Sequence, residues 1–172
     1  LSTPQPDGAP AVDNAAAPPL RLLFWETTAA CNLACVHCRR LDVSLKLSSD
    51  DLSTEHATTL IRSLPEVGRP ILVFSGGEPL MRPDLFDLCQ VARDVGLPTA
   101  LATNGTVMND TVARRIVDVG IRRVSMSLDG PCPEIHDKFR GIDGAFDSTL
   151  RGFGDLRRLG MSMQINTTVA RH

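Results

Sequence analysis

The sequence lacks the features of membrane-spanning, secreted and nucleic-acid-binding proteins. No apolar run in the 172 residues reaches the roughly 20 residues that a membrane-spanning helix needs. Residues 1–20 contain neither the basic nor the apolar segment of a secretory signal. Lysine is scarce, since only Lys46 and Lys138 occur among the 18 basic residues, and the net charge of −2 gives no electrostatic reason to expect nucleic acid. With 42% hydrophobic and 22% charged residues, the chain is predicted to be a globular cytoplasmic protein without membrane or nucleic-acid partners.

The five cysteines do not suit a disulfide framework, because their number is odd and three of them lie within eight residues. Cys31, Cys35 and Cys38 form a CxxxCxxC pattern, which is typical of reduced thiolates that hold a metal. A structural zinc ion takes four protein ligands, and His37 is poorly placed as the fourth because it adjoins Cys38. A [4Fe-4S] cluster held by three cysteines leaves one iron open to another ligand. The spacing favours an iron–sulfur cluster, with zinc and no metal as the remaining alternatives.

Residues 1–19 hold five of the twelve prolines and show no apolar periodicity, so they are predicted to be a disordered leader. From Leu20 onward, short apolar runs bounded by turn residues predict strands that are buried on both faces. These runs are residues 21–25, 71–74, 99–102, 124–128 and 163–166.

The segments between these strands predict amphipathic helices. Their apolar faces are Leu85, Leu88, Cys89 and Ala92, then Val112, Ile116 and Val119, and then Phe146, Leu150 and Phe153. The predicted N-caps are Ser53 or Thr54, Asp84 and Asn109, and the predicted left-handed C-terminal caps are Gly68, Gly96, Gly120 and Gly160. Alternating strands and helices predict a parallel sheet with its functional residues at the carboxyl ends of the strands.

Polar residues follow or end each of the later predicted strands. They are Ser75 to Glu78, Thr103 to Gly105, the group Ser125, Ser127 and Asp129, and the pair Gln164 and Asn166. Two glycines after a buried strand let a ligand approach the backbone, and the Glu78 carboxylate suits a cationic ammonium group. Any one of these groups could be an ordinary satisfied core residue. Their recurrence at one edge of the sheet predicts a binding site.

Together, these motifs resemble the radical S-adenosylmethionine (SAM) superfamily over roughly residues 20–172. The resemblance rests on CxxxCxxC after the first strand, GGEP after the second, TNG after the third, and SLDG followed by HDKFRG. It implies an α/β fold, namely the partial (β/α)6, TIM-like barrel of that family. The chain ends after the fifth predicted strand, so the core domain, residues 20–172, is expected to be C-terminally incomplete.

The resemblance also implies a cofactor site. Cys31, Cys35 and Cys38 would hold a [4Fe-4S] cluster whose open iron chelates SAM. Gly76, Gly77 and Glu78 would bind the SAM amino group, Ser127 its ribose, and Asn166 would lie near the adenine. The remaining residues implied in SAM binding are His37, which stands where the family has an aromatic residue against adenine, Thr103, Asn104 and Asp129.

The implied reaction is reductive cleavage of SAM to a 5′-deoxyadenosyl radical, which abstracts a substrate hydrogen, with flavodoxin or ferredoxin as the reductant. The stretches LFWETTAACNLACVHCR, LATNGT and QINTTVARH look most similar to enzymes of the alternative haem pathway, which oxidatively decarboxylate porphyrin propionates. They also look like SPASM-type maturases of ribosomal peptides. The substrate is therefore expected to be a tetrapyrrole or a peptide. The alternative is a non-catalytic metal-binding fragment.

Several other residues carry weaker predictions. Arg39, Arg40 and Arg82 are either partners for propionates or solvated surface residues. Cys89 is predicted to be a core residue, and Cys132 is predicted to stand outside the ligand set. His56 and His136 are predicted to be surface or turn-stabilising residues.

Overall fold

The computed structural model describes residues 18–38 and 51–169 of the chain. Five parallel strands form one sheet in the order β1-β2-β3-β4-β5. The strands are β1 (Leu20–Glu26), β2 (Gly68–Ser75), β3 (Thr99–Thr103), β4 (Arg123–Ser127) and β5 (Met163–Asn166). The parallel sheet predicted from the alternating pattern is confirmed. Except for Pro18 and Pro19, the predicted leader lies outside the described residues.

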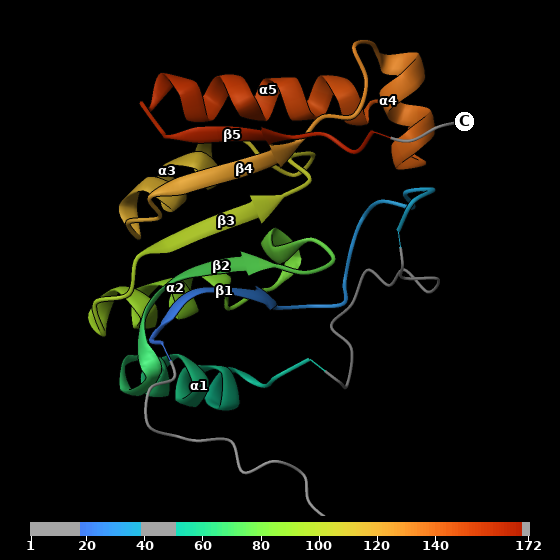
Figure 1. Ribbon diagram of the computed structural model, residues 1–172. Helices are drawn as coiled ribbons and strands as arrows, with labels where there is room; N and C mark the ends of the chain where they lie inside the picture. Colours follow the sequence, from blue (N-terminus) through green and yellow to red (C-terminus); the bar gives the residue numbers. More distant parts are fainter. Residues whose placement is uncertain (1–17, 39–50, 170–172) are drawn as a thin grey trace, which may run out of the picture.

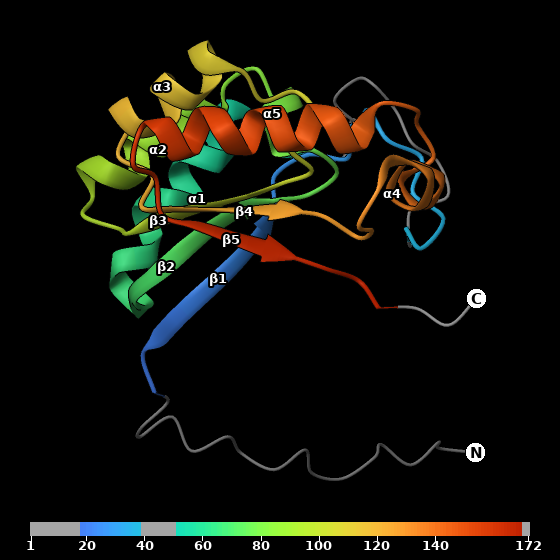
Figure 2. The same cartoon turned by 90° about the horizontal axis from the view of Figure 1, so that it is seen from above.

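Helices connect the strands and cover one face of the sheet. They are α1 (Thr54–Val67), the short 3-10 helix η2 (Pro79–Met81), α2 (Leu85–Asp94), α3 (Asp110–Asp118), α4 (Pro133–Arg140) and α5 (Ala145–Arg158). All strand arrows point the same way in Figure 1, and Figure 2 shows α1, α2, α3 and α5 on one side of the sheet. Helix α4 lies instead beyond the carboxyl ends of the strands (Figure 2). Of the helices that the structure describes, none has the length and apolarity needed to cross a membrane.

Two of the predicted N-caps act as expected. The Ser53 hydroxyl accepts a hydrogen bond from the His56 backbone N–H at 3.2 Å, and the Asn109 amide oxygen accepts one from Val112 N–H at 3.0 Å. Such caps satisfy N–H groups that have no partner within the helix, and each contributes about 1 kcal/mol. Asp84 stands at the predicted position before α2 but makes no side-chain cap bond.

The core lies between the sheet and the helices. Phe74, Leu101 and Met126, from the three central strands, are at most 1% exposed, and each stabilises the fold by about 1.5–3 kcal/mol.

The prediction that the strands are buried on both faces holds only in the middle of β2, where the successive residues Leu72, Val73 and Phe74 are all buried. It is wrong for the other strands, because the helices cover only one face of the sheet. On the other, concave face, Leu22 is 48% and Phe24 is 64% exposed. The result is a partial, TIM-like barrel that is open on this side.

Two predicted details of the helices are also wrong. The buried face of α5 differs from the predicted face, which included Leu150. Leu150 is 43% exposed, and Gly152 is buried instead. A side chain at Gly152 would bring its Cβ to 2.5 Å from Met108 Cβ, so the glycine allows close packing. Gly68 is not a left-handed cap, because its φ is 148° and it is the first residue of β2. A Cβ at this position would lie 2.6 Å from the Leu20 carbonyl oxygen.

Candidate functional site

A cavity of about 260 Å³ lies at the carboxyl ends of the strands. Its volume lies just below the ~300–1,000 Å³ usual for small-molecule sites. The loop after β1, the ends of β2 to β5, and α4 all contribute to its walls. All but two of the predicted site residues line it: Cys31, Cys35, His37, Cys38, Gly76, Gly77, Thr103, Asn104, Ser127 and Asn166. The two that do not are Glu78 and Asp129.

Backbone hydrogen bonds hold the cysteine loop, residues 27–38, against the end of β2. Gly77 N–H donates to the Thr28 carbonyl at 2.8 Å, and Glu78 N–H donates to the Ala30 carbonyl at 2.7 Å. Both glycines of the GGE motif allow this close approach. At Gly77, for example, a Cβ would lie 2.2 Å from the Ala30 carbonyl oxygen. The motif that was predicted to contact a ligand therefore also fixes the start of the cysteine loop.

Three N–H donors point at the cysteine sulfurs. Leu33 N–H donates to Cys31 Sγ at 3.5 Å, and the Asn104 side chain lies 4.0 Å from the same sulfur. The Arg140 guanidinium donates to Cys35 Sγ from 3.6 Å. Such donors stabilise thiolates, which are the form that binds metal. Burial, with smaller contributions from Glu78 and Cys35, raises the pKa of the Cys31 thiol.

The chemistry of these residues fits an iron–sulfur cluster. Cys31, Cys35 and Cys38 place three soft sulfur donors in one cavity, and none of them forms a disulfide. Within residues 18–38 and 51–169, no three histidine, cysteine or acidic side chains are already gathered as a set of metal ligands.

Glu78 is fully buried beneath the cavity, where its carboxylate accepts three hydrogen bonds. Oε1 accepts from Thr103 Oγ1 at 2.7 Å and from Leu80 N–H at 3.0 Å, and Oε2 accepts from Asn104 N–H at 2.7 Å. Burial raises the pKa of Glu78, while these hydrogen bonds act in the opposite direction. The carboxylate thus fixes the TNG turn after β3. Asn104 in turn donates to Asn32 Oδ1 in the cysteine loop at 2.9 Å.

We expect the pH dependence of stability to report on Glu78. Because its pKa in the fold lies above the ordinary value of 4.5, its contribution favours the folded state below that pH and is lost as pH rises through the raised pKa. The free energy of unfolding of the wild type, relative to Glu78→Gln, should fall as pH rises above 4.5. Urea unfolding up to about pH 8 measures this difference. Glu66→Gln, on an exposed face of α1, is the control. A constant difference for Glu78→Gln would contradict the expectation.

Three of the four predicted polar residues on β4 and β5 face the cavity. Ser125, Ser127 and Asn166 line it, and the strand register pairs Ser127 with Asn166. Ser125 Oγ also donates to the Leu101 carbonyl at 3.4 Å. Gln164 does not line the cavity, but its amide donates to Asn166 Oδ1 at 2.8 Å. Ser127 and Asn166 therefore stand side by side at one wall.

His37 lines the cavity and stacks on Phe139 of α4. The two ring centroids lie 4.4 Å apart, and the ring planes differ by 13°. Burial and the charge of Arg140 lower the pKa of His37, so the imidazole favours its neutral form at neutral pH. This contact gives the exposed His37 ring a fixed orientation at the position where the radical SAM resemblance implies an aromatic residue.

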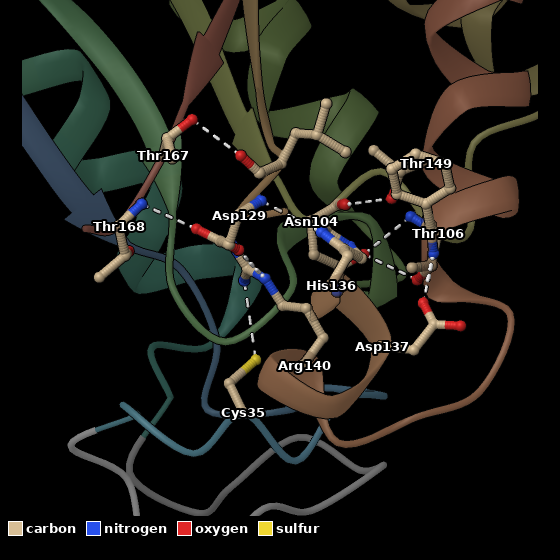
Figure 3. A network of polar contacts seen from close by, with 12 residues as sticks. Cys35, Asn104, Thr106, Asp129, His136, Asp137, Arg140, Thr149, Thr167 and Thr168 are labelled. Atoms are coloured by element: carbon tan, nitrogen blue, oxygen red, sulfur yellow. Dashed lines mark hydrogen bonds and ion pairs between the residues drawn. The ribbon is translucent and has the colours of Figure 1, made fainter. Parts of the chain in front are cut away.

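The HDKFRG motif forms a polar network around Asp129 (Figure 3). Asp129 N–H donates to His136 Nδ1 at 3.1 Å, and Arg140 Nε donates to Asp129 Oδ2 at 2.5 Å. Asp137 accepts the N–H groups of Gly144 and Phe146, both at 2.7 Å, and so caps the start of α5. Arg140 also lines the cavity. The sequence motif alone does not indicate this role of Arg140.

The remaining predictions have mixed outcomes. Cys89 is a core residue, as predicted, and burial raises its pKa to about 12. His56 is exposed, whereas His136 is buried and stabilises the turn at Asp129. Cys132 precedes α4 and is absent from the cavity walls. Arg39 and Arg40 lie outside the described residues.

Arg82 is neither a solvated residue nor available to a substrate. It is 3% exposed, and its guanidinium donates to the carbonyls of Thr27 at 2.6 Å and Leu52 at 2.8 Å. It also forms an ion pair with Asp84, with 2.7 Å between Nε and Oδ1. Both predicted uses of Arg82 are therefore wrong. The side chain instead joins the end of β1 to the starts of α1 and α2, and its partners explain why Asp84 does not cap α2.

Comparison with known proteins matches residues 25–172 to the sequence profile of the Radical SAM superfamily. The chain belongs to the radical SAM superfamily. The cofactors of this family of enzymes are a [4Fe-4S] cluster and SAM. The radical SAM assignment made from the cysteine, GGEP, TNG and SLDG motifs is confirmed.

Alignments with two curated relatives extend over most of this radical SAM chain. It is 46% identical over 154 residues to the AdoMet-dependent heme synthase of Oleidesulfovibrio alaskensis, covering 90% of this chain and 39% of that protein. It is 36% identical to the mycofactocin maturase MftC of Mycobacterium ulcerans, covering 87% and 40%. The chain thus spans about two fifths of the length of these relatives. In fold, it resembles Streptococcus suis SuiB bound to the precursor peptide SuiA, with a TM-score of 0.71 at 15% identity, covering 90% of this chain and 34% of that one.

Proposed function

We propose that this chain is the SAM-cleaving core of an enzyme that oxidatively decarboxylates propionate side chains of an iron porphyrin in haem biosynthesis. One observation carries the catalytic part of the proposal. A single cavity gathers three cysteine sulfurs, the glycines after β2 and the polar ends of β3, β4 and β5. A zinc module has no use for the last two sets. The porphyrin substrate is favoured by the 46% identity to a heme synthase.

In this proposal, each wall of the cavity has its own task. Cys31, Cys35 and Cys38 hold the cluster. The backbone around Gly76 and Gly77 receives the amino end of SAM, while Ser127 and Asn166 receive its ribose and adenine. When bound, the cluster and SAM supply an electron and a 5′-deoxyadenosyl radical for hydrogen abstraction.

Three predicted residues have specific tasks in this arrangement. Glu78 acts from below, because both of its carboxylate oxygens already accept hydrogen bonds from the protein. It keeps Thr103 and Asn104 at the cavity wall. His37, held by Phe139, offers a ring face to the adenine end. Asp129 does not line the cavity, and acts through Arg140.

A second candidate is a maturase of ribosomal peptides. The 36% identity to mycofactocin maturases favours it. The third candidate, a non-catalytic metal-binding fragment, would bind iron without cleaving SAM. For either catalytic function, we propose a small electron-transfer protein such as flavodoxin or ferredoxin as the reductant. We also propose a cytoplasmic location.

Anaerobic reconstitution with iron and sulfide, followed by dithionite and SAM, tests the catalytic part. We expect 5′-deoxyadenosine to form, because the cavity contains both the thiolates and the residues proposed to bind SAM. Cluster binding without this product would favour the non-catalytic fragment, and zinc in place of iron would overturn the proposal. Absorbance titration with a propionate-bearing iron porphyrin, compared with a precursor peptide, then separates the two substrate classes. Tighter binding of the peptide would favour the maturase.

A further inference from the structure

A buried ion pair stands behind the cysteine loop. The side chains of Asp129 and Arg140 are 1% and 10% exposed, and Arg140 Nε lies 2.5 Å from Asp129 Oδ2. Removing two charges from water is costly, and their mutual attraction often only offsets that cost. A hydrophobic pair would fill this space at less cost. The pair is therefore best explained by what its charges do for a neighbour.

That neighbour is Cys35. While Nε of Arg140 is bound to Asp129, Nη1 of the same guanidinium donates to Cys35 Sγ at 3.6 Å. The planar guanidinium has donors on fixed edges, so occupation of one edge by a carboxylate directs another edge at the sulfur. Figure 3 shows the arginine between the carboxylate and the sulfur.

The backbone keeps the cysteine loop at this distance. Ala34 N–H donates to the Arg140 carbonyl at 3.2 Å, and Val36 N–H donates to the Phe139 carbonyl at 3.0 Å, so both neighbours of Cys35 are bound to the end of α4. Gly141 permits the contact. Its φ is +74°, and a Cβ there would lie 2.3 Å from the Ala34 carbonyl oxygen.

Asp129 is fixed independently of the arginine. Its Oδ1 accepts the Thr168 N–H at 2.8 Å, and its own N–H donates to His136 Nδ1 at 3.1 Å. The carboxylate therefore does not follow the guanidinium but positions it (Figure 3). Asp129 and the buried His136 are thus positioning residues for Arg140.

We propose that Arg140, positioned by Asp129, raises the reduction potential of the cluster held by Cys31, Cys35 and Cys38 through a charge-assisted N–H···S hydrogen bond to Cys35. This inference rests on the proposed function. A reduced cluster carries one more negative charge than an oxidised one. A cationic donor on a ligand sulfur stabilises the reduced form more, and the reduction potential of iron–sulfur clusters depends on such hydrogen bonds.

The test is a redox titration of the reconstituted chain without SAM, followed by electron paramagnetic resonance of the reduced cluster. At the potential where half of the wild-type cluster is reduced, we expect Arg140→Gln to show a roughly tenfold smaller ratio of reduced to oxidised cluster. For a one-electron couple this corresponds to a shift of about 59 mV to lower potential. Lys138→Gln removes the same charge from an exposed position of the same helix and should leave the potential unchanged.

Equal potentials in Arg140→Gln and wild type, with the iron content intact, would overturn the inference, as would an equal shift in Lys138→Gln. Weaker SAM binding with an unchanged potential would also overturn it, and would make Arg140 a SAM contact instead. If Arg140→Gln does not hold four irons, Arg140→Lys decides the matter. The lysine ammonium keeps the charge but lacks the second nitrogen by which the guanidinium reaches Cys35 while Nε holds Asp129, so the reduction potential of the Arg140→Lys cluster should fall below that of wild type. The proposed function fails separately, if wild type forms no 5′-deoxyadenosine.

Discussion

Replacement of Cys35 by alanine is expected to abolish the brown chromophore and to reduce 5′-deoxyadenosine formation to background. Cys35 is the central cysteine of the loop, and its neighbours Ala34 and Val36 are both hydrogen-bonded to the end of α4. The loop is therefore held in place and cannot bring another sulfur to the position of Cys35 Sγ. With two thiolates left, a cubane cluster loses one of three protein ligands, and its binding free energy falls accordingly. Iron and sulfide analysis after anaerobic reconstitution, with the visible absorbance, measures the effect.

Cys132→Ala is the matched control for this experiment. Cys132 is also a free cysteine, but it lies before α4 and is absent from the cavity walls. This variant should retain about four irons per chain and the wild-type rate of SAM cleavage. Retention of a complete cluster in Cys35→Ala would contradict the ligand assignment, as would its loss in Cys132→Ala with the fold intact.

The second large effect is expected for Gly77→Ala. A Cβ at this position would lie 2.2 Å from the Ala30 carbonyl oxygen and 2.7 Å from the Ala29 carbonyl oxygen. Both are backbone atoms, so no side-chain rotation can relieve the overlap. The loop must move, which would disrupt the 2.8 Å bond between Gly77 N–H and the Thr28 carbonyl. We expect a loss of about 3 kcal/mol in the free energy of unfolding, from urea unfolding, together with loss of cluster binding.

Gly154→Ala makes the same substitution where space is available. Gly154 lies inside α5, and a Cβ there would meet nothing within 4 Å. Alanine is the better helix former, so this variant should be more stable by about 0.5–1 kcal/mol and should bind the cluster normally. If Gly77→Ala folds with wild-type stability and a full cluster, the close approach of β2 to the cysteine loop does not constrain the site.

The sequence was sufficient to predict the sheet and most of the cavity walls, because both depend on local patterns. Apolar runs between turn residues locate strands, and the ends of parallel strands meet at one edge whatever the details of packing. Ser127 and Asn166, for example, are neighbours because β4 and β5 pair in parallel register. Glu78 follows β2 as predicted but does not line the cavity, and two of its three hydrogen-bond partners, Thr103 and Asn104, lie at the end of β3.

What could not be predicted depends on contacts between distant segments. Arg82 looks like a surface arginine in the sequence, and only the meeting of β1, α1 and α2 encloses it. Arg140 likewise acquires its role from the approach of α4 to the cysteine loop. Phe24 is exposed because helices cover only one face of the sheet, and an apolar run in the sequence does not show how many faces are covered.

The contact between Cys35 and Arg140 has a consequence for how the protein is made. The two residues are 105 positions apart in the sequence. On a ribosome that adds ~5–20 residues per second, the cysteines are synthesised on the order of 5–20 s before α4 exists to hold their loop. During that interval the loop around Cys35 lacks its backbone hydrogen bonds to α4, and Cys35 lacks its arginine. Cluster insertion is therefore expected to follow synthesis of α4. Until then, other components of the cell must protect the nascent cysteines from oxygen and from other metals.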